Sequence, residues 1–381
     1  MRCDWSPLII GFILCTPCFA GDIAPDTARL AAHLERFRHH TIYELSATED
    51  KAIQHQYLNW INSRLKTGLS VARMNGELDA AKLLSNGPES VSEMFDKTYA
   101  GFLGEIEAKP VPPAEDLLAI TFGIYTGGDC NLDETLLLYG RKPLRRLAQV
   151  NGERSYTHGY ELRDFAIGKD NTGHGRMIGS AWVASNCTSN WNGNRFRIDL
   201  LRGGSIDNVL DRDVSAYGDD KVKIRIEDNT VTFRYTTLMR GDVDALTRAG
   251  IACYRVQDGH ATREAPLATS FASFINEWLE MDDAEAARWS SPEASMHHHL
   301  LAAKAAKQAL QWEHVAACPG PSPTREISLQ WSASKQTTVF RIGGSSAAEL
   351  RMLSVSDRLS PSCRQIDISA GLSSIVTEPM R

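Results

Sequence analysis

The sequence lacks most of the features that identify a function directly. It has no excess of positive charge, since 41 Lys and Arg residues stand against 47 Asp and Glu residues, a formal net charge of −6. Proteins that bind nucleic acid or an anionic membrane through bulk electrostatics need the opposite balance, so we expect neither partner. Beyond residue 20 no apolar run reaches the roughly 20 residues that a transmembrane helix requires. The overall mix, 43% hydrophobic and 23% charged, is that of a globular protein.

Motifs with fixed catalytic spacing are missing as well. The chain contains no H-E-x-x-H zinc motif, no G-x-S-x-G elbow, no S-x-x-K pair and no phosphate-binding Walker loop. We therefore predict no cofactor and no metal site. Catalysis stays open, because catalytic groups are assembled in space and need not be close in sequence.

Residues 1–20 have the pattern of a secretory signal. Arg2 gives a weakly positive start, residues 8–15 form a short apolar stretch, and Cys18-Phe19-Ala20 offers a small-x-small cleavage site. A lipid anchor on one of the two cysteines in this stretch is the alternative, disfavoured because bulky residues precede both. We expect cleavage after Ala20 and a secreted or periplasmic protein.

Export gives the remaining cysteines a structural role. Five cysteines lie beyond residue 20, and in an oxidising compartment they form at most two disulfides. Cys253 lies in a strand-like run and is expected to be a buried free thiol. The other four lie beside loop signals. Five cysteines allow fifteen two-bridge arrangements, and of these we favour pairing within domains, which gives Cys130–Cys187 and Cys318–Cys363.

The periodicity of apolar residues predicts an α+β fold. Helical spacing dominates up to residue 113, as in the stripe Ile53, Tyr57, Trp60 and Ile61, and the proline-rich residues 109–113 indicate a linker. We predict a signal peptide over 1–20, an N-terminal helical region over 21–113, a central antiparallel β domain over 114–262 and a helix-plus-strand unit over 263–381. In that last unit, C-terminal helices should pack with a small antiparallel sheet.

Several elements can be placed locally. Residues 222–226 and 231–235 alternate apolar and polar side chains around a polar turn, which predicts a β-hairpin. Phe271, Phe274 and Trp278 belong to a full helical stripe. Ser291-Pro292 predicts the start of an Ala-rich helix that continues to about residue 317. Four strand-like segments follow, over residues 327–332, 337–342, 350–355 and 364–368.

His174 is the one weak candidate for a catalytic residue. It lies in a glycine-rich turn, residues 171–175, where catalytic groups are often displayed. With a carboxylate such as Asp133 or Asp164 nearby it could act as an acid–base group. The sequence contains no activated nucleophile beside it.

Asn190, Trp191 and Asn192 are weak candidates for a ligand-binding surface. They belong to a polar segment, residues 186–194, in which amides and hydroxyls surround one tryptophan. Such a combination suits a sugar, because the indole can stack on its apolar face. A plain turn with the tryptophan folded onto the sheet is the structural alternative.

Two further clusters favour structural interpretations. His297-His298-His299 fan over about 200° of a helix, so they cannot converge on one metal ion. The acidic segment 207–220 does not fit a calcium loop, since Ala216 and Val222 occupy positions that require glycine and glutamate. We interpret it as a solvated loop.

These observations favour a non-catalytic binding or interaction protein that acts outside the cytoplasm, for example an inhibitor, an immunity-type protein or a cell-envelope accessory factor. Its partner would be a protein or a glycan. The alternative is an extracytoplasmic hydrolase of envelope polymers that uses His174 and loop carboxylates.

Overall fold

The computed structural model describes residues 107–111, 114–125, 132–141, 144–151, 160–169, 175–184, 191–217, 222–238, 247–308, 310–320 and 323–365, together with helical positions between residues 29 and 67. The chain divides into two compact units, residues 1–100 and 101–381. In the first unit the described residues are helical, and Leu30, Trp60 and Ile61 are buried. Among the described residues no helix is long and apolar enough to span a membrane.

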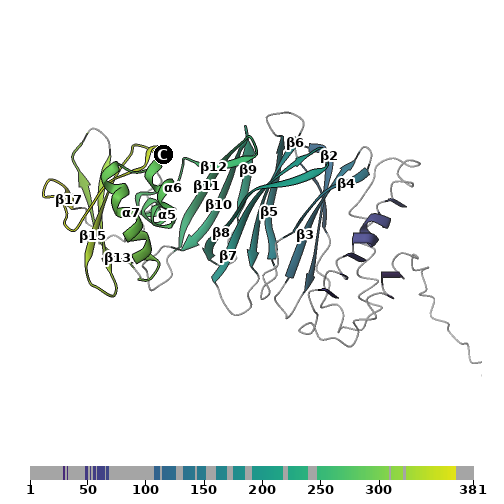
Figure 1. Ribbon diagram of the computed structural model, residues 1–381, viewed down its shortest axis with the longest axis horizontal. Coiled ribbons are helices and arrows are strands. Elements are labelled where there is room, and N and C mark those ends of the chain that lie inside the picture. The colour runs from purple at the N-terminus through teal and green to yellow at the C-terminus, as the bar shows by residue number, and fades with distance from the viewer. Residues whose placement is uncertain are drawn as a thin grey trace, which may run out of the picture. The chain divides into compact units, whose positions relative to one another are not determined.

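Twelve strands of the second unit form three four-stranded antiparallel sheets (Figure 1). Sheet 1 contains β1 (Glu107–Val111), β2 (Ala114–Tyr125), β3 (Leu132–Arg141) and β4 (Leu144–Asn151). Sheet 2 contains β5 (Tyr160–Lys169), β6 (Gly175–Ala184), β7 (Trp191–Arg202) and β8 (Ser205–Tyr217). Sheet 3 contains β9 (Lys223–Glu227), β10 (Thr230–Leu238), β11 (Thr247–Gln257) and β12 (His260–Glu264). In each sheet, strands that are consecutive in the chain are neighbours.

Sheet 2 is apolar on both faces because each face packs on another sheet. Ile178 and Trp182 of β6 lie in one core with Leu136 and Leu138 of sheet 1. On the other face Phe196 of β7 stacks on Phe233 of sheet 3, with ring centroids 4.5 Å apart. Strand β6 is therefore buried along nearly its whole length. Such a strand loses the apolar–polar alternation by which a half-exposed strand is recognised.

The fold is mostly β, and the predicted α+β class, with an N-terminal helical region and C-terminal helices, is wrong. The prediction already assigned residues 114–262, which contain most of sheets 1 to 3, to β structure. It overestimated the helical content on either side of that range, because residues 107–111 form β1 and residues 310–317, predicted as the end of a helix, belong to β13. The domain boundaries predicted after residues 113 and 262 stay predictions.

Two local predictions in this part of the chain are also corrected. The proline-rich segment predicted as a linker contains β1, an edge strand whose Pro110 lies opposite Leu118. Proline is tolerated there because an edge strand has one side without ladder hydrogen bonds. The acidic segment predicted as a loop is largely β8, in which Asp211 forms a bidentate ion pair with Arg195 at 2.5 Å.

The predicted hairpin is confirmed. It is formed by β9 and β10, with Ile226 opposite Val231 and Ile224 opposite Phe233. Asp228 and Asn229 at the turn have φ angles of 43° and 66°. Positive φ at both central positions is what a two-residue hairpin turn requires, and Asp and Asn tolerate it better than most residues.

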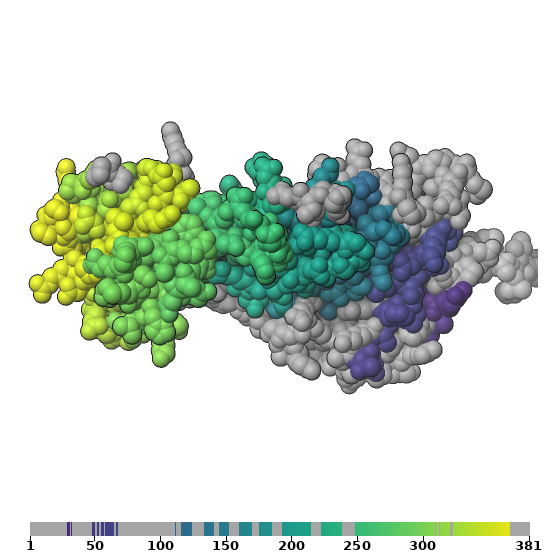
Figure 2. Space-filling model, turned by 45° about the horizontal axis from the view of Figure 1, so that its top comes forward, coloured from purple at the N-terminus to yellow at the C-terminus, as the bar shows by residue number. Residues whose placement is uncertain are grey.

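The C-terminal part, residues 267–365, combines three helices with a five-stranded antiparallel sheet. The helices are α5 (Phe271–Glu280), α6 (Asp283–Arg288) and α7 (Pro292–Ala305), and a short 3₁₀ helix, η4, covers Ala347–Glu349. Sheet 4 has the strand order β16-β15-β14-β13-β17. Its strands are β13 (Leu310–Cys318), β14 (Thr324–Trp331), β15 (Thr337–Gly343), β16 (Arg351–Ser356) and β17 (Arg364–Gln365). On the face shown in Figure 2 the green surface of the helices continues into the blue-green surface of sheet 3.

Apolar packing and side-chain caps explain the helices. Phe274, Ile275 and Trp278 of α5 are fully buried in a core with Trp331 and Phe340 of sheet 4. Ser270, Asp282 and Ser291 each accept a hydrogen bond from the backbone N–H three residues later, which caps the three helices in turn. The predicted start at Ser291-Pro292 is confirmed. The predicted end near residue 317 is wrong, because α7 ends at Ala305 and β13 begins at Leu310.

One of the two predicted disulfides is present. Cys318 at the end of β13 is bonded to Cys363, 45 residues later in the chain. Cys253 is a buried free thiol, as predicted, and burial raises its pKa. The predicted Cys130–Cys187 bond lies outside the described residues.

The close packing of sheet 2 on sheet 3 depends on Gly179 of β6. A Cβ atom at this position would lie 2.9 Å from Val231 and 3.0 Å from Ile224, both in sheet 3. We expect Gly179→Val to lower the free energy of unfolding by about 1–3 kcal/mol, because it overpacks a dense layer. Denaturant unfolding measures this change.

Gly193→Ala in the adjacent strand β7 is the matched control. A Cβ atom there would meet nothing within 4 Å. Its effect should stay within about 0.5 kcal/mol, as for other exposed positions. Equal destabilisation by both variants would contradict the packing of these two sheets.

Candidate functional site

Half of the residues singled out in the sequence as catalytic or ligand-binding candidates lie outside the part of the chain that the structure describes. His174 and Asn190 both fall there, so the hydrolase hypothesis that uses His174 stays a prediction. Trp191 and Asn192 begin β7, where they pair with Tyr217 and Ala216 of β8. A ligand-binding role for these residues stays a prediction as well.

The three consecutive histidines occupy different environments. His297 and His299 are exposed, whereas His298 is 1% exposed and packs edge-on against Trp278, with ring centroids 4.7 Å apart. Its Nδ1 lies 2.6 Å from Oδ1 of Asp283, and its Nε2 lies 2.8 Å from the carbonyl oxygen of Trp278. Both partners are acceptors, so a ring protonated at both nitrogens can donate to both. His298 therefore joins α5, α6 and α7, and the hydrogen bond that it forms lowers the pKa of Asp283.

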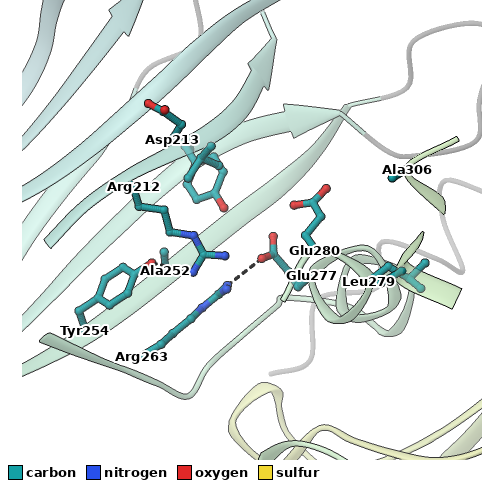
Figure 3. Close-up of a pocket in the computed structure, with 12 residues that line it drawn as sticks. Arg212, Asp213, Ala252, Tyr254, Arg263, Glu277, Leu279, Glu280 and Ala306 are labelled. Carbon is teal, nitrogen blue, oxygen red and sulfur yellow. Dashed lines mark hydrogen bonds and ion pairs between the residues drawn. The ribbon is translucent and has the colours of Figure 1, made fainter. Parts of the chain in front are cut away.

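The most distinctive polar site lies where sheets 2 and 3 meet the helices. A cavity of about 280 Å³ opens there, walled on one side by β8, β10, β11 and β12 and on the other by α5 and α7 (Figure 3). Its lining consists of Arg212, Asp213, Val214, Tyr235, Ala252, Tyr254, Arg263, Glu277, Leu279, Glu280, Ala302 and Ala306. None of these residues was singled out in the sequence as a site residue.

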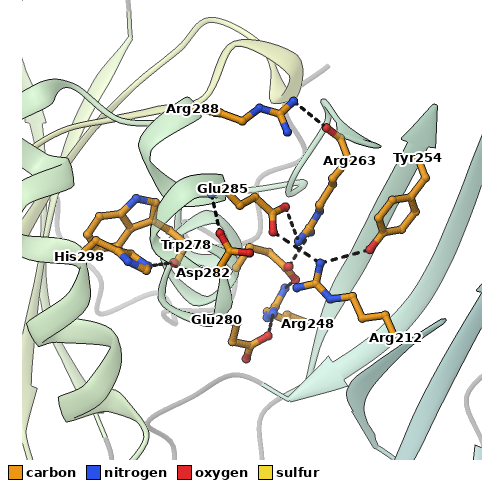
Figure 4. Close-up of polar contacts among 11 residues, drawn as sticks. Arg212, Arg248, Tyr254, Arg263, Trp278, Glu280, Asp282, Glu285, Arg288 and His298 are labelled. Carbon is orange, nitrogen blue, oxygen red and sulfur yellow. Dashed lines mark hydrogen bonds and ion pairs between the residues drawn. The ribbon is translucent and has the colours of Figure 1, made fainter. Parts of the chain in front are cut away.

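Four of these lining residues, Arg212, Arg263, Glu277 and Glu280, form ion pairs with one another or with Arg248 and Glu285. We call these three arginines and three glutamates the arginine–glutamate cluster. The arginines come from strands β8, β11 and β12, whereas the glutamates come from helices α5 and α6 (Figure 4). Every ion pair of the cluster described below therefore joins a strand to a helix.

Glu277 is the centre of the cluster. Its Oε1 lies 2.7 Å from Nη1 of Arg248, and its Oε2 accepts a hydrogen bond of 2.7 Å from Nη2 of Arg263. All three side chains are at most 4% exposed. One carboxylate thus compensates two buried guanidinium groups, and the carbonyl oxygen of Arg263 accepts a further hydrogen bond from Arg288.

The outer part of the cluster is looser. Glu285 lies 3.5 Å from Arg263 and 3.7 Å from Arg212, and Glu280 lies 4.0 Å from Arg248. The only hydrogen bond of the Arg212 guanidinium to the described residues is a long one, 3.3 Å, to the hydroxyl of Tyr254. Its side chain is 30% exposed, far more than those of the two inner arginines.

Burial and neighbouring charges shift the pKa values of titrating groups in the site away from pH 7. Burial alone raises the pKa of Glu277, but Arg248 and Arg263 outweigh it and lower that pKa from 4.5 to about 2. Burial also raises the pKa of Tyr235, and the negative charge of Glu277 adds to this effect. Burial lowers the pKa of Arg263, but the attraction of Glu277 prevails and the net shift is upward. Near pH 7 these groups therefore hold fixed protonation states.

The sequence carried one faint signal of this site. Glu277 stands within the apolar stripe of α5, between the buried residues Phe274 and Trp278. Arg263 lies opposite Tyr254 on the inward face of sheet 3. A charge at an apolar position needs a buried partner, but the partners are distant in the chain and no spacing rule connects them.

One group in the described part of the chain has metal-ligand chemistry, and it consists of Cys318, Glu326 and Cys363. Its two sulfur atoms are bonded to each other, so they are not available as thiolate ligands in this state. Comparison of the chain with known protein families and with curated protein sequences gives no match.

The cluster predicts that Glu277 contributes strongly to the free energy of unfolding. We expect Glu277→Gln to lower the free energy of unfolding by about 3–5 kcal/mol, because two buried cations lose their shared counter-charge. The wild-type carboxylate has a folded pKa of about 2, below its ordinary value of 4.5, so its contribution is complete above pH 4.5 and declines as the pH falls toward 2. The variant should lose this part of the acid dependence. Urea unfolding between pH 7 and pH 2.5 measures both effects.

Glu293→Gln is the control for removing one carboxylate, because Glu293 is exposed on α7. Its effect should stay within about 0.5 kcal/mol at every pH. An unchanged stability of Glu277→Gln would show that the buried ion pairs do not form.

His298 provides an independent test of the helical part. We expect His298→Ala to lower the free energy of unfolding by about 2–4 kcal/mol, because it removes two hydrogen bonds and the contact with Trp278. The neighbouring substitution His297→Ala should be nearly neutral. Thermal unfolding of the two variants distinguishes them, and similar melting temperatures would contradict the burial of His298.

Proposed function

We propose that the chain is an exported, non-catalytic binding protein, and that the cavity beside the arginine–glutamate cluster is its binding site. The observation that carries this proposal is that Glu277, at the cavity wall, lies between the guanidinium groups of Arg248 and Arg263. Efficient acid–base catalysis needs a group whose pKa lies near the working pH. Glu277, with a pKa of about 2 and two arginines bound to it, is not such a group.

A wall of this kind is suited to recognition. Its donors and acceptors are held in place by one another, so a ligand meets groups that need little reorganisation on binding. The cavity volume of about 280 Å³ is at the small end of ligand pockets, which commonly range from about 300 to 1,000 Å³. The ligand should therefore be a small molecule or the end of a longer one.

The disulfide supports the placement outside the cytoplasm. Cys318–Cys363 connects the end of β13 to the segment before β17. Structural disulfides persist in oxidising compartments and are rare in the cytosol. The signal-like residues 1–20 agree with this placement.

The proposal is tested by recovering the bound molecule. The protein, purified from the extracytoplasmic fraction of a producing strain, is incubated with a small-metabolite mixture, separated from unbound compounds by rapid gel filtration, and denatured. We expect mass spectrometry to recover a compound with unchanged mass, because the cavity binds without reacting.

The cavity-filling variant Ala302→Phe is the control. Ala302 lies on α7 at the cavity wall, so a phenyl ring there should occupy the space and prevent recovery of the compound. Ala303→Phe, on the exposed side of the same helix, should bind as the wild type does. Conversion of the compound, or equal retention by Ala302→Phe, would refute the proposal.

A further inference from the structure

The guanidinium group of Arg212 has N–H donors for which the described residues around it supply no acceptor. A guanidinium group carries five N–H donors, and among the described residues this one makes a single hydrogen bond, of 3.3 Å, to Tyr254. The nearest carboxylate, Glu285, lies 3.7 Å away, too far for a hydrogen bond. Figure 3 shows the guanidinium pointing from β8 toward Glu277 and Glu280, into the cavity. It is therefore the cationic group best placed to receive a ligand.

The charge of the cluster limits which anion can bind there. The six charges of the cluster sum to zero, and Asp213, which also lines the cavity, adds one negative charge, so an entering anion is not drawn in by a net positive field. A monoanion adds one charge to a site that is partly buried, whereas a phosphate adds about two and meets three carboxylates nearby. Because the cost of burying charge rises steeply with its amount, the balance favours a monoanion. A carboxylate also matches the planar fork of arginine through two parallel hydrogen bonds.

The apolar residues of the lining indicate the chemical character of the rest of the ligand. Leu279 of α5, Ala302 of α7 and Ala306, which directly follows α7, form the wall that faces the strands. On the strand side, Val214 of β8 and Ala252 of β11 add small apolar side chains. Short apolar side chains leave room for a few carbon atoms and offer them nonpolar contact. The cavity thus has a hydrogen-bond donor, Arg212, at one end and apolar side chains in another part.

We infer that the cavity binds a small organic monocarboxylate, with its carboxylate on Arg212 and a short apolar chain against α5 and α7. This inference rests on the proposed binding function and names its ligand class. Tyr254, which already contacts Arg212, holds the guanidinium in position for the carboxylate.

The test is isothermal titration of the full-length exported protein with a set of defined probes. The probes are the straight-chain carboxylates from acetate to octanoate, the amide of each, the corresponding alkylamines, glucose and inorganic phosphate. We expect the carboxylates to bind, the amides to bind at least about 10-fold more weakly, and affinity to rise with chain length until the cavity is full.

Variants assign the binding to Arg212. Arg212→Gln should weaken carboxylate binding by about 10- to 100-fold, because charge-assisted hydrogen bonds are lost. Arg212→Lys, which keeps the charge without the planar fork, should fall between Arg212→Gln and the wild type. Arg234→Gln, at an exposed position of β10, is the matched control and should leave binding unchanged. Circular dichroism checks that each variant is folded.

The outcomes separate this inference from the proposed function. If the amides, amines, glucose or phosphate bind best and Ala302→Phe abolishes their binding, the cavity is a binding site but the ligand class is wrong. If carboxylates bind equally to wild type and a folded Arg212→Gln variant, the role of Arg212 is refuted. If no probe binds and no metabolite is recovered, both the inference and the binding function fail.

Discussion

A single buried carboxylate, that of Glu277, links helix α5 to strands β11 and β12 of sheet 3. Glu277 accepts contacts from Arg248 and Arg263, and all three side chains are almost completely excluded from solvent. Charges in such a place are tolerated only together, since either partner alone would carry a large desolvation penalty. The strands that supply the cations and the helix that supplies the anion are therefore coupled.

The same interaction also fixes the protonation states of two groups that line the cavity, Glu277 and Tyr235. A carboxylate clamped by two guanidinium groups keeps its charge across the physiological range, and the phenol of Tyr235 keeps its proton. Arg212, farther out, is more exposed and forms one long hydrogen bond, to Tyr254, among the described residues. In the proposed binding function, the inner pairs are structural and Arg212 is the residue that contacts the ligand.

The packing of the sheets in layers also determines which secondary-structure elements can be predicted from the sequence. The β9–β10 hairpin was predictable because one face is buried and the other exposed, so its side chains alternate. The helix of residues 271–280 was predictable for the matching reason at helical spacing. Strand β6, buried on both faces, shows neither pattern clearly. It nevertheless lies inside the segment predicted as β, and the α+β class was wrong because too much helix was predicted outside that segment, where β1 and β13 lie.

By itself the sequence indicated the local elements with a polar side, the helix start at Ser291 and the buried free thiol of Cys253. It favoured the Cys318–Cys363 pairing among fifteen possible arrangements without excluding the others. These follow from neighbours in the chain or from the few cysteines that can meet. Only the tertiary structure decided that Arg212, Arg248 and Arg263 face glutamates from two helices, and that the middle one of three histidines is buried. The physical reason is that an ion pair between distant residues has no period and no spacing, so it exists only once the layers have packed.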